Sequence, residues 1–115
     1  MERLLQFETR IDGTRAIELM LVEHKSWAAK GVVRLRVETD TAFLSNLHVS
    51  PRHRRKGVAG RLVKECALLA QKRKCETLSL IVKKQNKTAR KAYRKMGFRC
   101  VYNFEDGHSI FSIRI

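Results

Sequence analysis

The hydrophobic pattern of this chain changes its period once, at its single proline, Pro51. Before Pro51, apolar and polar residues alternate, as in Leu5, Phe7, Thr9 and Ile11, which occupy every second position. A period of two predicts strands, whereas the apolar residues beyond Pro51 recur at helical spacing. The predicted elements are therefore four strands, a helix around residues 58–70, a strand at 78–82, a helix around 89–96 and a hairpin over 98–115.

This order constrains the fold class. Helices that arrive only after a run of strands predict an α/β (α+β) sandwich built around a mixed sheet. The length of 115 residues fits one domain, over residues 1–115. The dipeptide Asp12-Gly13 is a strong hairpin signal, so the first two strands are expected to connect directly.

Several classes of protein are excluded by composition. Three cysteines without a C-x-x-C pair argue against a disulfide framework or a zinc site, so no metal is expected. Free thiols are typical of a reducing compartment, which predicts a cytoplasmic location. The sequence shows neither a secretory signal nor an apolar run long enough to cross a bilayer, so no membrane contact is expected.

The positive charge is confined to one part of the sequence. The net charge is +14, yet residues 1–50 hold seven basic and seven acidic residues. Residues 51–100 hold seventeen basic residues and two acidic ones. Part of this excess is a solvated helix face, but its size predicts a surface that binds an anion.

A short basic loop precedes the first predicted helix, and small residues open that helix. The first turn of a helix has unpaired N–H groups, and glycine lets a ligand approach them closely. The segment 54–60 can therefore hold a phosphate or pyrophosphate, although an ordinary strand-to-helix turn has the same pattern. It matches neither a P-loop nor a dinucleotide-binding fingerprint.

Two motifs resemble the signatures of the GNAT superfamily of acetyl-coenzyme A-dependent N-acetyltransferases. Residues 54–59 (RRKGVA) resemble its R/Q-x-x-G-x-G/A signature, and residues 86–98 (NKTARKAYRKMGF) resemble N-x-x-A-x-x-x-Y-x-x-x-G-F. Residues 47–51 (LHVSP) resemble the end of the family's fourth strand. The resemblance covers residues 42–115 and implies a twisted, mostly antiparallel sheet of about seven strands, flanked by two main helices and splayed between the fourth and fifth strands.

The resemblance also implies a site for acetyl-coenzyme A. The pantetheine arm would lie along the fourth strand, and the diphosphate on main-chain amides of the basic loop. The implied cofactor-binding residues are Leu47, His48, Val49, Arg54, Arg55, Lys56, Gly57, Val58, Ala59, Gly60 and Asn86. Tyr93 matches the position of the proton donor to the leaving thiolate, although its helical stripe also suits a core residue. Asn86 equally suits a helix cap.

No general base is evident from the sequence. His48 is a candidate because an unperturbed imidazole titrates near neutrality, but a histidine on a buried strand is more often structural. Water is the alternative proton acceptor. The family often carries two helices between its first two strands, and their absence here predicts an open acceptor side suited to a macromolecular amine on a protein or an aminoacyl-tRNA.

The charge suggests two alternatives to catalysis, namely the binding of a nucleic acid and the binding of an acidic protein. Coenzyme A would engage only some of the basic residues, so residues 52–99 are expected to bind a nucleic acid or an acidic protein as well. The chain could then be a non-catalytic module of the same fold that binds such a partner. Open sheet edges are also compatible with a homodimer.

Overall fold

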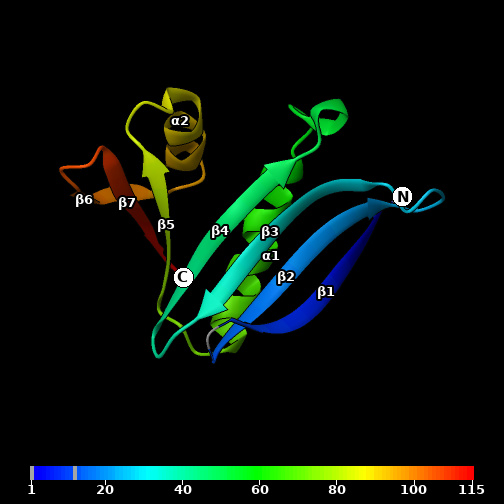
Figure 1. The fold of residues 1–115 in the computed structure, drawn as a ribbon, viewed down its shortest axis with the longest axis horizontal. Coiled ribbons are helices and arrows are strands. Elements are labelled where there is room, and N and C mark those ends of the chain that lie inside the picture. The colour runs from blue at the N-terminus through cyan, green and yellow to red at the C-terminus, as the bar shows by residue number, and fades with distance from the viewer. Residues whose placement is uncertain (1, 12) are drawn as a thin grey trace.

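The computed structural model describes residues 2–11 and 13–115, and its elements follow the predicted order (Figure 1). The elements are β1 (Glu2–Ile11), β2 (Thr14–Glu23), β3 (Ala29–Val37), β4 (Thr41–Val49), the short 3-10 helix η1 (Pro51–His53), α1 (Val58–Lys72), β5 (Thr77–Lys83), α2 (Lys87–Lys95), β6 (Arg99–Asn103) and β7 (His108–Arg114). The expected fold of seven strands and two main helices is confirmed.

The seven strands form one sheet in the order β1-β2-β3-β4-β5-β7-β6. Every neighbouring pair is antiparallel except β4 and β5, which are parallel. Ile11 pairs with Thr14, so β1 and β2 are joined directly, as predicted; Asp12 of that turn lies outside the described residues. In the described part of the chain, no helix is therefore inserted between the first two strands.

Both helices cover the same face of the sheet. Helix α1 packs on Gly31 of β3. On the same face, Leu35 of β3 pairs with Leu44 of β4, Leu44 with Leu80 of β5, and Leu80 with Phe111 of β7. Arg90 and Arg94 of α2 lie over the Phe111 ring, at 4.9 and 5.3 Å from its centroid. Within the described residues the other face carries no helix, and we call it the bare face.

The core lies between α1 and the central strands. Helix α1 is amphipathic and buries one stripe against the sheet, consisting of Val58, Leu62, Val63, Cys66 and Ala70. The apolar row of β1 does not join this core, because the register of β1 on β2 turns Leu5 and Phe7 to the bare face. Phe7 is consequently 47% exposed.

The sequence led to expectations about the cysteines and about membrane-spanning segments. The three cysteines, Cys66, Cys75 and Cys100, are free, as expected. Among the described residues, no helix has the length and apolar character needed to cross a bilayer.

Gly31 sets how closely α1 approaches the sheet. A methyl group there would lie 2.8 Å from Val58 Cγ1, 3.0 Å from Leu62 Cδ1 and 3.1 Å from the carbonyl oxygen of His48. Because a carbonyl of the sheet cannot move aside, Gly31→Ala is expected to lower the free energy of unfolding by about 1–3 kcal/mol, the cost typical of an overpacked core.

Urea denaturation of the two proteins measures this difference. Gly60→Ala is the matched control, because a Cβ at Gly60 meets nothing within 4 Å. That change lies in a helix and is expected to stabilise the protein by up to about 1 kcal/mol. Equal stability of Gly31→Ala and the unmodified protein would contradict the close packing of α1 on β3.

Candidate functional site

The site is built around the point where β4 and β5 separate. The two strands pair only from Thr41 and Thr77 to Leu44 and Leu80. Beyond that point β4 continues to Val49 and β5 to Lys83, and the two diverge (Figure 1). In this gap the polar backbone of β4 has no strand partner on its β5 side within the described residues. The splay implied by the family resemblance is therefore present.

A β-bulge at Asn46 determines which side chains of β4 face the helices. The register of β3 on β4 shifts there, and Asn46 adopts a left-handed backbone with φ of 53°. Asparagine tolerates that conformation better than most residues do. The extra residue reverses the alternation of the strand, so Leu47 and Val49 lie on the helix face although Phe43 and Ser45 lie on the bare face.

The larger cavity, which we call the cofactor cavity, lies on the helix side of the gap and has a volume of about 740 Å³. The end of β4, the basic loop, the first turn of α1 and one side of α2 enclose it. It is lined by Leu47, Val49, His53, Arg54, Arg55, Gly57, Val58, Ala59, Gly60, Asn86, Thr88, Ala89, Ala92, Tyr93, Lys95 and Met96.

The first turn of α1 presents unpaired amides to this cavity. The first intrahelical bond runs from the Arg61 amide to the Gly57 carbonyl, at 3.0 Å, and no side chain caps the helix. The amides of the first turn before Arg61 therefore lack intrahelical partners. Gly57 has φ of 80°, and a Cβ on it or on Gly60 would meet nothing within 4 Å. A ligand can thus approach this backbone without obstruction.

Side chains of the basic loop hold it against the sheet. Arg54 Nε donates a hydrogen bond to the Val49 carbonyl, at 3.1 Å. His53 lies between two partners, with Nδ1 at 2.7 Å from Ser50 Oγ and Nε2 at 2.9 Å from Glu23 Oε1. The bond from His53 is the main reason that the pKa of the Glu23 carboxyl is lowered. The start of the loop is therefore held to β2 through Glu23 and to the end of β4 through Val49.

Helix α2 contributes Asn86 and Tyr93. The Asn86 side chain accepts a hydrogen bond from the Ala89 amide at 3.1 Å, so the capping role is present, and the residue also lines the cavity. The Tyr93 ring meets the edge of Phe98, with centroids 5.8 Å apart. No hydrogen bond to its hydroxyl is found among the described residues, and burial raises the pKa of the phenol. The hydroxyl therefore remains a protonated donor.

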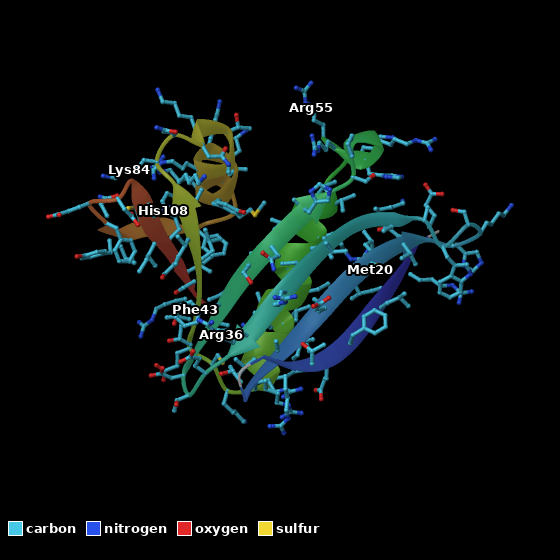
Figure 2. The ribbon with its side chains drawn as sticks, in the orientation of Figure 1. Met20, Arg36, Phe43, Arg55, Lys84 and His108 are labelled. Carbon is cyan, nitrogen blue, oxygen red and sulfur yellow. The ribbon has the colours of Figure 1, made fainter. Side chains whose placement is uncertain are left out.

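Residues around the cofactor cavity suit an anionic, elongated ligand. Unpaired amides, Arg54, Arg55 and Lys95 lie along it, and neither helix has an acidic residue in its first turn. In Figure 2, Arg55 and Lys84 lie at the same end of the molecule, on either side of the gap between β4 and β5. Apolar side chains such as Leu47 and Met96 supply the remaining walls. This donor set fits a nucleotide with an uncharged arm.

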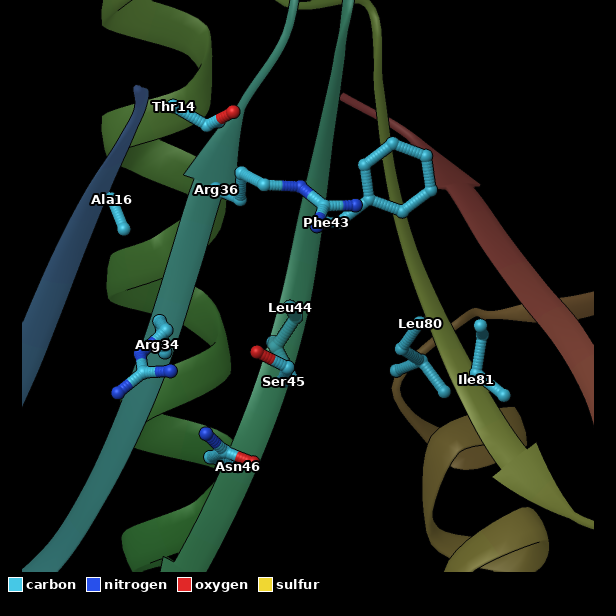
Figure 3. Close-up of a pocket in the computed structure, with 10 residues that line it drawn as sticks. All are labelled: Thr14, Ala16, Arg34, Arg36, Phe43, Leu44, Ser45, Asn46, Leu80 and Ile81. Atoms are coloured by element: carbon cyan, nitrogen blue, oxygen red, sulfur yellow. The ribbon is translucent and has the colours of Figure 1, made fainter. Parts of the chain in front are cut away.

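A second cavity opens on the bare face and has a volume of about 540 Å³ (Figure 3). We call it the acceptor cavity, after the role proposed for it below. It reaches the place where β4 and β5 part, because Leu44 and Leu80 both line it. Its other lining residues are Thr14, Ala16, Arg34, Arg36, Phe43, Ser45, Asn46 and Ile81. Arg34 and Arg36 are two residues apart on β3 and therefore share a face, but nothing in the sequence indicated that this face lines a cavity.

Nine of the eleven residues assigned to cofactor binding from the sequence, together with Tyr93, line the cofactor cavity. His48 and Lys56 line neither large cavity. His48 is exposed, because the bulge at Asn46 turns it to the bare face. Within the described residues, no group of three or more His, Cys, Asp or Glu side chains could hold a metal ion. Sequence reasoning missed all residues of the acceptor cavity, and in the cofactor cavity it missed His53, Thr88, Ala89, Ala92, Lys95 and Met96.

The sequence model of the acetyltransferase (GNAT) family matches residues 28–98, which include β3, β4, α1, β5 and α2. The chain belongs to the GNAT family. GNAT acetyltransferases use acetyl-coenzyme A, so membership confirms the cofactor class predicted from the two motifs.

Individual relatives agree with this assignment. The GNAT chain is 38% identical over 72 residues to GCN5-related N-acetyltransferase 4, chloroplastic, of Arabidopsis thaliana; this match covers 63% of the chain and 24% of that protein. The chain thus spans about a quarter of the length of this curated relative.

Solved structures share the fold at low identity. The ribosomal-protein-S18-alanine N-acetyltransferase of Escherichia coli has a TM-score of 0.81 at 20% identity, covering 100% of this chain and 94% of that one. The PaiA N-acetyltransferase of Thermoplasma acidophilum, in complex with coenzyme A, has a TM-score of 0.80 at 20% identity. This match covers 87% of this chain and 61% of that one.

Proposed function

We propose that this GNAT protein transfers the acetyl group of acetyl-coenzyme A to an amine on a macromolecule. One observation carries the proposal: the split between β4 and β5 has a cavity on each side, one lined by unpaired amides and one open on the bare face. A donor bound on the helix side and an acceptor bound on the bare face would meet at this split.

The chain's own residues suit the binding step. Amides of Val58, Ala59 and Gly60, at the positive end of the α1 dipole, would bind the diphosphate, with Arg54 and Arg55 beside them. The free edge of β4 at Leu47 and Val49 would orient the pantetheine amides by backbone hydrogen bonds. The second amide atom of Asn86, which the helix cap leaves free, could also contact the cofactor.

Acetyl-coenzyme A would supply a thioester, whose C–S bond breaks as the acceptor nitrogen bonds to the acetyl carbon. Tyr93 Oη would donate its proton toward the departing sulfur, and water would restore it. The described residues lining the acceptor cavity include no carboxylate or imidazole, so water would also take the amine proton. His53 is engaged by Glu23 and Ser50, and His48 lines neither cavity.

An open acceptor side supports a macromolecular acceptor. The β1–β2 connection is a direct hairpin, and within the described residues no helix covers the bare face. A small amine would be held there by one wall only, whereas a macromolecule would make contacts along the sheet. The E. coli neighbour carries a ribosomal protein in its name.

The decisive experiment combines a thermal shift with a turnover assay. Acetyl-coenzyme A is expected to raise Tm in a concentration-dependent way, since a ligand that binds only the folded state stabilises it. Thiol release is then measured with protein, peptide, aminoacyl-tRNA and small-amine acceptors. Preference for a free small amine would overturn the macromolecular acceptor, and turnover with none of these acceptors would overturn catalysis.

A second candidate, a non-catalytic binding module, is favoured by the charge on and around α2. Residues 83–99 contain eight basic residues and no acidic one. Lys87, Lys91 and Lys95 are exposed and follow one another at four-residue intervals, so they form a row on one side of the helix. Binding of an anionic partner that falls steeply with salt, without thiol release, would favour this function.

The pH profile of turnover is expected to rise with pH, following deprotonation of the acceptor amine. An α-amino group has a pKa of about 7.7–8.0 and a lysine about 10.4, so a rise that levels off by about pH 9 identifies an α-amine, and a rise that continues to pH 10 identifies a lysine. Burial disfavours the charged phenolate and raises the pKa of Tyr93, so this donor stays protonated across the range. The measurement is kcat/KM from about pH 6 to pH 10. A falling limb centred below about pH 9 would contradict Tyr93 as the donor.

A further inference from the structure

We propose that the acceptor is an acidic polypeptide segment, in which a carboxylate close to the acceptor amine binds Arg34 and Arg36. This inference rests on the proposed function and names the substrate class of the acceptor cavity. Two of the ten residues that line this cavity are arginines, and none is acidic (Figure 3). The cavity therefore favours an anion beside the reacting amine.

Arg36 has donors available for such an anion. Its guanidinium reaches across β4 toward Phe43, with Cζ 5.2 Å from the ring centroid (Figure 3). A cation–π contact of this kind uses the face of the ring and does not occupy the N–H donors of the guanidinium with a hydrogen-bond acceptor. Arg36 Nε lies 3.3 Å from Glu38 Oε1, but both side chains are half exposed. Exposed pairs of this kind contribute little, so a bound carboxylate can replace Glu38.

Arg34 is held in place on the neighbouring position of the same face. Its Nε and Nη2 lie 3.3 and 2.8 Å from Glu18 Oε1, across the β2–β3 pair. This ion pair occupies one side of the guanidinium fork and leaves Nη1 without a hydrogen bond among the described residues. Arg34 therefore adds a fixed positive group next to the more adjustable Arg36.

A carboxylate suits these two groups better than an uncharged or cationic neighbour would. Guanidinium and carboxylate form paired, charge-assisted hydrogen bonds, whereas a flanking cation would meet like charge. Exposed Ile81 and the Leu80 side chain provide an apolar wall for the stem of an acidic side chain. The cavity can thus hold both the charged end and the aliphatic part of Asp or Glu.

A polypeptide is favoured over a nucleic acid as the carrier of this anion. Single-stranded nucleic acids bind to exposed aromatic faces on which bases stack. Phe43 is the aromatic residue of this cavity, and Arg36 lies over its ring. An extended peptide requires no stacking platform, and the bare face leaves room for it on the β1–β3 side of the cavity.

The test uses the full chain and peptides that carry a single amine. In one series Glu, Gln or Arg stands on both sides of a single lysine and the N-terminus is blocked. In the other series the amine is the free N-terminus, and Glu, Gln or Arg follows the first residue. Thiol release gives kcat/KM, and fluorescence anisotropy gives the peptide affinity without requiring turnover. The Glu-flanked peptide is expected to exceed the Gln-flanked one by about tenfold, equal to about 1.4 kcal/mol, and the Arg-flanked one by more.

Two variants at Arg36 sharpen the result. Arg36→Gln is expected to remove most of the preference for Glu over Gln flanks, and Arg36→Glu to reverse it in favour of Arg flanks. Arg114→Gln is the matched control, because Arg114 is exposed, lies outside the basic segment 52–99 and lines neither large cavity. The control is expected to keep the ratio of the unmodified protein. Equal use of all three peptides, or a preference that survives Arg36→Glu, would overturn the inference.

Separate outcomes distinguish this inference from the proposed function. If the protein binds acidic peptides selectively but releases no thiol with any acceptor, the proposed catalysis is wrong and the acidic ligand remains supported. Turnover without charge selection would keep catalysis and remove the acidic ligand. If free glutamate or aspartate is acetylated as efficiently as the Glu-flanked peptides, the acceptor is not a polypeptide segment. Preferred acetylation of an aminoacyl-tRNA would lead to the same conclusion.

Discussion

Replacing Tyr93 with phenylalanine is expected to lower kcat by about 10²-fold or more, the range typical of the loss of a positioned proton donor. Tyr93 lines the cofactor cavity, and burial keeps its hydroxyl protonated by raising the pKa of the phenol. The KM for acetyl-coenzyme A is expected to change by less than about threefold, because the lost interaction belongs to the transition state. Steady-state kinetics with the best peptide acceptor measures both values.

The fold is expected to tolerate Tyr93→Phe. The phenylalanine ring keeps the edge contact with Phe98, so Tm should stay close to that of the unmodified protein. Tyr102→Phe is the matched control, because Tyr102 is 56% exposed on β6 and lines neither large cavity. An unchanged kcat in Tyr93→Phe would assign this tyrosine to the core alone, which was the other interpretation of its helical stripe.

Gly60→Glu is expected to weaken acetyl-coenzyme A binding by at least about 100-fold, which corresponds to about 2.7 kcal/mol. Gly60 lines the cofactor cavity in the first turn of α1, and a Cβ there points into open space. The added carboxylate would occupy room beside the unpaired amides and repel the diphosphate. Isothermal titration of acetyl-coenzyme A measures the change in Kd.

The same substitution is expected to leave the fold intact or make it more stable. Glutamate is a better helix former than glycine, and an acidic residue near the start of a helix complements its dipole. Gly60→Lys is the matched control, since it adds similar bulk with the opposite charge and should bind the cofactor more tightly than Gly60→Glu does. Unchanged affinity in Gly60→Glu would show that the diphosphate binds elsewhere.

The predictable part of this protein depends on short stretches of sequence. The change of period at Pro51 indicated where strands give way to helices, because each period reflects the geometry of a single element. The unpaired amides of segment 54–60 and the cap at Asn86 are also predictable from local sequence, since both are properties of the end of a single helix. These patterns do not depend on which strand lies next to which.

Faces of the sheet were decided by tertiary structure. The apolar row of β1 was visible in the sequence, but its register on β2 turned Leu5 and Phe7 away from both helices. A single bulge at Asn46 reversed the alternation of β4, so Leu47 entered the cofactor cavity and His48 did not. A shift of one residue exchanges the two faces of a strand, and local propensity does not contain that shift.

The sequence by itself determined the order of the elements, the turn with unpaired amides before α1 and the helical stripe that contains Tyr93, because each depends on neighbours within one or two helical turns. The family resemblance implied that β4 and β5 separate, but only the tertiary structure decided that they part after Leu44 and Leu80, and that Arg34 and Arg36 line the cavity on the far side. Those positions are set by pairing between distant strands, whose register follows from packing of the whole sheet against α1.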